Sequence, residues 1–196
     1  MSEMMQRQFE REPAKRVFAA ELREATRTIK DSTDEKSPAY VLLPTGERCN
    51  RILIAGAITD KTRAGEQNII YRARVSDPTG VFYVSAGSYQ PEAMLQMTKI
   101  DTDTPSFVVV VGKPNAYTSP DGRVLVSVRV ESIQVVDRAT RDMWVADTAK
   151  ATLKRVGVMF GEDVENIPDA KLARETYPQK EEYWKRMVFD ALSKMM

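Results

Sequence analysis

The sequence predicts a mainly β protein with a five-stranded barrel, a short helix between the third and fourth strands, an N-terminal extension and C-terminal helices. Three observations predict this class. Residues 69–97 read as strand, tight turn, strand and short helix. Residues 123–136 alternate apolar and polar side chains at the period of a strand. Two stretches with apolar residues at helical spacing follow. We expect the extension at 1–44, the barrel at 45–138 and the helical region at 139–196.

The second and third strands form a hairpin whose register can be derived from the sequence. If Asp77 to Gly80 form the loop, Ser76 pairs with Val81, and each outward step pairs the next two residues. One face is then apolar and consists of Tyr71, Ala73, Val75, Phe82, Val84 and Ala86. The other face is polar and consists of Arg72, Arg74, Tyr83 and Ser85. The first face builds a core, and the second is free to bind a ligand.

The remaining barrel elements follow from local patterns. Residues 51–59 form the first strand, in which Gly56 fits a bulge or a sharp bend. Residues 90–97 place a proline near the start of a short helix. Residues 105–112 are an apolar run bounded by proline and glycine, typical of a buried strand. With the fifth strand at 123–136, this is the element order of the oligonucleotide-binding (OB) fold.

The segments that flank the barrel leave alternatives open. Residues 17–25 predict a narrow helical stripe, which a hydrophilic linker at 31–38 follows. This extension either docks on the rest of the protein or is a partly disordered tail. Residues 140–156 and 178–195 each predict an amphipathic helix. These helices either cover the ends of the barrel or form an interface with partner chains.

Composition argues against catalysis. The chain has no histidine and one cysteine, Cys49, which removes the commonest general base, an intramolecular disulfide and a cysteine-rich zinc cluster. We expect no enzyme, cofactor, metal or small-molecule substrate. No apolar run approaches the ~20 residues that span a bilayer, and no signal-type segment opens the chain, so we expect a cytoplasmic protein without a membrane partner. Predicted turns contain the carboxylates of Asp60, Asp77, Asp101, Asp103 and Asp121.

Candidate binding residues come from local placement, because Lys and Arg total 29 against 28 for Asp and Glu. OB barrels bind single strands across strands two and three, between the loops that join strands one to two and four to five. Arginines there neutralise phosphates, and a tyrosine stacks on a base. The candidates are Arg72, Arg74 and Tyr83 on the strands, Lys61 and Arg63 in the first loop, Lys113 and Tyr117 in the second loop, and Arg129 on strand five.

Three runs resemble the OB domain of the replication protein A (RPA) family: NRILIAGAITDK, SDPTGVFYVSAG and VVVVGKPNAYTSPDGRVLVSVRVESIQVVDR. The whole chain is similar to archaeal RPA-associated or small-subunit-like proteins. The resemblance implies weak binding of single-stranded DNA and a larger RPA subunit as partner. It also implies that the helix after strand five joins partner subunits through Met143, Trp144, Ala146, Ala149, Leu153 and Val156.

The sequence therefore favours a single-stranded DNA-binding accessory subunit of an archaeal RPA-type complex in replication and repair. Two alternatives stay open: an OB scaffold that acts mainly through protein–protein interaction, and an RNA-binding OB module.

Overall fold

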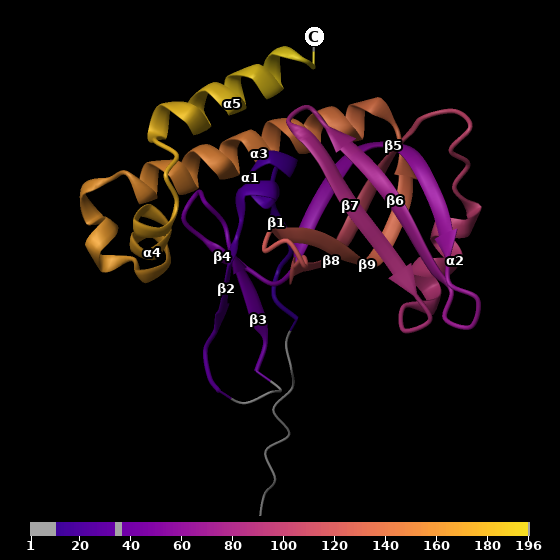
Figure 1. The fold of residues 1–196 in the computed structure, drawn as a ribbon. Coiled ribbons are helices and arrows are strands. Elements are labelled where there is room, and N and C mark those ends of the chain that lie inside the picture. The colour runs from indigo at the N-terminus through magenta and orange to yellow at the C-terminus, as the bar shows by residue number, and fades with distance from the viewer. Residues whose placement is uncertain (1–10, 34–36, 196) are drawn as a thin grey trace, which may run out of the picture.

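A computed structural model describes residues 11–33 and 37–195, and it shows a barrel beside a layer of helices (Figure 1). Residues 1–10, 34–36 and 196 lie outside the described part. The expectations that fall there are the first part of the N-terminal extension, the start of the chain without a signal segment, and the middle of the linker.

The barrel is the predicted five-stranded OB-fold. Its strands follow the order β5-β6-β7-β9-β8, and β8 pairs back on β5 to close it. A short helix, α2 (Pro91–Lys99), connects the third strand to the fourth. The strands are β5 (Ile52–Ala64), β6 (Ile70–Asp77), β7 (Gly80–Gly87), β8 (Ser106–Thr118) and β9 (Val124–Val136).

The predicted hairpin register is confirmed. Ser76 lies opposite Val81 and Arg74 lies opposite Tyr83, as the alternation of apolar residues requires. Asp77 and Gly80 also pair, so the loop is shorter than expected by this one pair. The apolar face fills the barrel, where Val75 and Phe82 are almost completely buried.

Gly56 allows two strands to approach closely. A Cβ atom built on it would lie 2.3 Å from the carbonyl oxygen of Ser76, so only glycine fits without a shift of the backbone. The irregular pairing of β5 falls two residues later, between Ile58 and Asp60. That bulge changes which side chains of β5 face outward in its second half.

The N-terminal extension docks on the protein. Its elements are β1 (Lys15–Arg16), which pairs in parallel with β5, α1 (Ala19–Glu24), and a three-stranded sheet of β2 (Arg27–Lys30), β3 (Ala39–Leu42) and β4 (Arg48–Cys49). Val17 and Phe18 are fully buried, so the interpretation as a partly disordered tail is wrong for this stretch. The helix is only six residues long, and the expected linker joins two paired strands.

Four helical segments follow the barrel. They are α3 (Arg138–Met159), the 3-10 helix η1 (Glu162–Asn166), α4 (Pro168–Thr176) and α5 (Glu181–Ser193). The long helix α3 packs between the barrel and α5 (Figure 1). The indole of Trp144 donates a hydrogen bond of 3.0 Å to the Leu53 carbonyl of β5, and its ring meets Phe18 edge-on at 5.7 Å. A second core forms around Trp184 of α5, which is fully buried.

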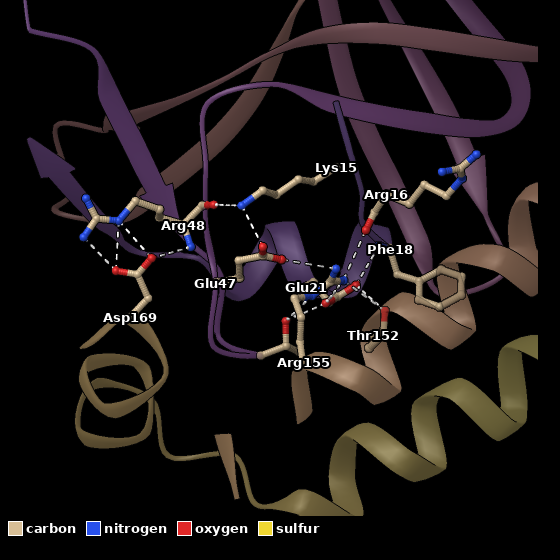
Figure 2. A network of polar contacts seen from close by, with 10 residues as sticks. Lys15, Arg16, Phe18, Glu21, Glu47, Arg48, Thr152, Arg155 and Asp169 are labelled. Atoms are coloured by element: carbon tan, nitrogen blue, oxygen red, sulfur yellow. Dashed lines mark hydrogen bonds and ion pairs between the residues drawn. The ribbon is translucent and has the colours of Figure 1, made fainter. Parts of the chain in front are cut away.

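A buried ion pair joins the extension to α3 (Figure 2). Glu21 of α1 is fully buried, and its carboxylate lies 2.8 Å from the Nη2 atom of Arg155. The same carboxylate accepts hydrogen bonds from the hydroxyls of Thr45 and Thr152 and from the backbone N–H of Phe18. Because Arg155 also donates to the Arg16 carbonyl, this network connects α1, β1, the β3–β4 turn and α3.

We predict that Arg155→Met destabilises the fold by about 3–5 kcal/mol, because it leaves the Glu21 carboxylate buried without a cation. Urea unfolding followed by circular dichroism measures this loss. Lys185→Met is the control, since it removes one partner of an exposed pair on α5 and should leave the unfolding free energy nearly unchanged. Equal effects of the two changes would contradict a structural role for the buried pair.

A second buried carboxylate, that of Asp77, ties α1 to the hairpin. It accepts hydrogen bonds from the backbone N–H of Ala19 at 2.7 Å, from Thr79 through both the N–H and the hydroxyl, and from the N–H of Gly80. The Thr79 hydroxyl in turn accepts from the N–H of Ala20. Burial raises the pKa of Asp77 to about 6, although these hydrogen bonds favour the charged form.

This raised pKa predicts a particular pH dependence. The folded state holds the proton of Asp77 more tightly than the unfolded state, whose carboxyl keeps its ordinary pKa near 3.8. The wild type should therefore gain stability relative to Asp77→Asn as the pH falls from about 7 through 6 toward 4, by up to about 3 kcal/mol. Urea titrations of both proteins at several pH values measure this difference. A difference that shrinks as the pH falls would show that the folded pKa is lowered instead.

Candidate nucleic-acid interface

The outer face of the barrel carries a row of cations that crosses four strands. Arg72 of β6 lies opposite Ser85 of β7. Ser85 is in turn aligned with Arg129 of β9, and Arg129 lies opposite Lys113 of β8. Side chains at directly paired positions project to the same face of a sheet. Three of these four side chains are cationic, and we call this set the cationic row.

Two further rows lie beside the cationic row. In the middle row Arg74 lies opposite Tyr83, and on the neighbouring strands Ser127 lies opposite Asn115. The third row is apolar and consists of Val81, Leu125 and Tyr117, of which the last two lie opposite each other. Tyr83 and Tyr117 remain 57% and 53% exposed, so both rings are accessible for stacking. The outer face therefore grades from cationic to apolar across three rows.

Two adjoining hollows follow these rows. One, of about 520 Å³, is lined by Arg72, Arg74 and Tyr83. The other, of about 570 Å³, is lined mainly by apolar side chains of β7 and β9 and is bounded by Leu22 of α1. Tyr83 lines both hollows, so the polar and the apolar parts of the face meet at its ring. A linear ligand that carries both charged groups and flat apolar groups fits such a surface.

Charge on this face is only partly compensated within the protein. The Nε atom of Arg74 lies 3.8 Å from the carboxylate of Asp60, and both side chains are about half exposed. An exposed pair at this distance contributes little, so Arg74 can exchange its partner for a phosphate at small cost. Asp60 belongs to strand β5, and its expected place in a turn is wrong.

The structure does not bring Lys61 and Arg63 to the outer face. Both lie within β5, which continues through the predicted loop to Ala64. The bulge before Asp60 reverses the alternation, so Lys61 pairs with the buried Ala73 rather than with an arginine. The expected binding role of these two residues therefore loses its geometric basis.

Lys61 instead caps helix α2. Its Nζ atom donates to the carbonyl oxygens of Met97 at 3.1 Å and Thr98 at 3.2 Å, and to that of Ile100. These carbonyls belong to the end of the helix, where they lack partners within the helix and attract a cation.

We predict that Lys61→Met lowers the free energy of unfolding by about 1–2 kcal/mol, because it removes charged hydrogen bonds to three carbonyls and keeps the aliphatic stem. It should leave any oligonucleotide affinity unchanged. Urea unfolding and fluorescence titration of the same preparation measure both quantities. Weaker binding without loss of stability would return Lys61 to the interface.

Other carboxylates do act as local turn formers. Asp77 accepts from the backbone within its own hairpin, and Asp101 accepts from the N–H of Asp103. The Ser119 hydroxyl and the Arg123 backbone N–H donate to Asp121, and these hydrogen bonds lower its pKa. Tyr117 lies at the end of β8, just before this turn, and not at its tip.

The predicted partner stripe on α3 does not form one free face. Trp144, Ala149 and Val156 are buried within the chain, while Met143 and Leu153 are 63% and 41% exposed. The buried side of α3 contacts the barrel through Trp144 and the extension through Arg155. The sixth residue, Ala146, is partly buried.

Sequence reasoning missed several residues of the outer face. Val81 and Leu125 occupy alternate positions on the same side of their strands as the polar face. The alternation therefore indicates their place, but their apolar character does not suggest a binding surface. Leu22 and Tyr89 gave no such signal, because their positions depend on how the extension and the β7–α2 loop pack.

Cys49 and the carboxylates of the described residues form no metal-binding cluster. Burial raises the pKa of the Cys49 thiol to about 12, so it stays protonated and unreactive. No group of three or more His, Cys, Asp or Glu side chains in the described ranges is placed to hold a metal ion. Within those ranges no helix is long and apolar enough to cross a bilayer.

Comparisons with known proteins identify no family for this chain. No protein-family model and no curated protein matches the sequence. The second single-stranded DNA binding protein (SSBb) of Mycobacterium smegmatis is 19% identical with a TM-score of 0.38, over 45% of this chain and 87% of that one. Mitochondrial Rim1 of S. cerevisiae is 15% identical with a TM-score of 0.35, over 45% and 94%. The structure of yeast Stn1 and Ten1 is 12% identical with a TM-score of 0.42, over 64% of this chain and 63% of that one. These likenesses are too distant to assign a function, which must be inferred from the outer face.

Proposed function

We propose that the protein binds single-stranded DNA across the outer face of the barrel, without catalysis. The observation that carries this proposal is the grading of that face from the cationic row to the apolar row. A single strand has a charged backbone on one side and stacking bases on the other, so its two sides match the two sides of the face.

In this arrangement the strand runs along the rows and therefore across the β-strands. Phosphates contact Arg72 and Arg74, while bases stack on Tyr83 and Tyr117 and cover the apolar row. Stacking accepts every base because each has a π-face, so the binding is tolerant of sequence. The net charge of +1 favours weak rather than tight binding by the isolated chain.

The resemblance to the RPA family extends this proposal to an accessory subunit that works with a larger RPA subunit in replication and repair. The exposed Met143 and Leu153 on α3 are the part of the predicted partner stripe that remains accessible. A partner subunit would cover these two side chains, since Trp144, Ala149 and Val156 already pack within the chain.

We predict that the triple variant Arg72→Ala, Arg74→Ala and Tyr83→Ala loses binding to a labelled oligothymidine. Tyr83→Ala alone should weaken binding roughly tenfold at every salt concentration. Each arginine change should reduce the slope of log affinity against log salt by about 0.7, which is the value for one lost phosphate contact on a single strand. Fluorescence anisotropy at a series of salt concentrations measures both effects.

Matched controls lie on α5, outside the barrel strands whose side chains form the three rows. Arg186→Ala and Phe189→Ala remove an exposed arginine and an exposed aromatic ring, and they should leave affinity and salt slope unchanged. Unchanged binding in the triple variant would overturn the proposed site. Tighter binding of an RNA oligonucleotide in competition would reassign the ligand, because only RNA presents a 2′-hydroxyl.

A further inference from the structure

Two like charges lie directly opposite each other at one end of the cationic row. Lys113 of β8 pairs with Arg129 of β9, and both side chains project from the outer face. Like charges at paired positions destabilise a sheet. Among the described residues neither side chain has an ion pair or a hydrogen bond with a protein group. The protein thus maintains a repulsion that an external anion would relieve.

The surroundings of this pair are polar and open. Lys113 and Arg129 line a hollow of about 940 Å³ together with Tyr40, Arg51 and Tyr89. This hollow reaches from the barrel to the N-terminal segment, whose strand β3 contacts β8. It is the end of the outer face opposite to the apolar hollow beside α1.

The nearby carboxylates already have partners. Glu131 pairs with the Nε atom of Arg51 at 2.9 Å, and Glu12 accepts a hydrogen bond of 2.7 Å from the hydroxyl of Tyr40. That hydrogen bond, together with burial, raises the pKa of Tyr40 to about 12, so its phenol carries no charge. Neither of these two carboxylates is paired with Lys113 or Arg129.

An exposed aromatic ring stands beside the pair. Tyr89, in the loop between β7 and α2, is 94% exposed, so packing within the chain does not account for it. The loop itself is held by the hydrogen bond from Gln90 N–H to the Gly87 carbonyl at 2.8 Å and by the return bond from Gly87 N–H to the Gln90 side chain. A defined turn thus presents a free ring next to two free cations.

We propose that this end of the face is a second nucleotide subsite, in which Lys113 and Arg129 hold one phosphate and Tyr89 stacks on the adjoining base. The subsite rests on the proposed function, because it receives the continuation of the strand bound by Arg72, Arg74 and Tyr83. Arg72 and Arg129 are two strand spacings apart, about 10 Å, so they contact different phosphates. The strand then leaves the barrel over the N-terminal segment.

The test compares oligothymidines of about 4 and about 12 nucleotides, two lengths within the ~4–16 nucleotides that one OB barrel covers. The wild type should bind the longer strand more tightly. Tyr89→Ala, and the double variant Lys113→Gln with Arg129→Gln, should each weaken the longer complex about five- to tenfold and leave the shorter one nearly unchanged. Fluorescence anisotropy at low salt measures all six affinities.

Controls separate this subsite from a structural effect. Tyr89→Phe keeps the ring and should match the wild type, and Leu95→Ala removes another exposed side chain, on α2. The double glutamine variant should melt at the same or a higher temperature without DNA, because it removes a repulsion. Binding of both lengths without any dependence on Tyr89 or the cation pair overturns the subsite alone. If the wild type binds neither the shorter nor the longer oligothymidine, the proposed function is overturned, and this subsite with it.

Discussion

The buried pair of Glu21 and Arg155 is the interaction on which the arrangement of the other parts depends. It joins residues 134 positions apart in the chain, one on a six-residue helix and one on the long helix α3. A helix as short as α1 is not stable by itself and needs tertiary contacts. The Glu21 carboxylate supplies several such contacts at once. It caps the first turn of α1 by accepting from the Phe18 N–H, and it accepts hydrogen bonds from two threonine hydroxyls. Removing water from two charges is costly, and only a fully satisfied network makes such a pair tolerable.

This constraint has consequences for the outer face of the barrel. Since α1 is fixed against α3 from one side and against Asp77 from the other, its residue Leu22 forms a stable wall of the apolar hollow. The extension continues into β2 and β3, and β3 contacts β8 near the Lys113–Arg129 pair. The N-terminal segment thus bounds both ends of the face, and the barrel alone does not define the interface.

Local patterns predicted the barrel and its hairpin well, because a one-residue shift would have moved Val75 and Phe82 out of the core. The same reasoning failed for Lys61, since one bulge in β5 reverses the alternation and the sequence does not show where it falls. It also failed for α3, because three of the six residues of the expected partner stripe pack inside the chain, beside Arg155, a residue that no hydrophobic pattern would place inside. The short strands of the extension were missed because they have only two to four residues each, too few to show an alternation, and because β1 is held by the distant strand β5.

The near balance of charge and the concentrated cationic row lead to one kind of binding. A net charge of +1 produces almost no long-range field, so it does little to steer a strand toward the protein. Cations in one row act only over roughly 8–10 Å at physiological salt, the distance at which screening sets in. The row therefore contributes after contact, through direct phosphate neutralisation, and the tyrosines contribute through stacking that salt affects little. An interface of this type gains affinity with each nucleotide that reaches it, which makes the length of the available strand more important than the total charge of the protein.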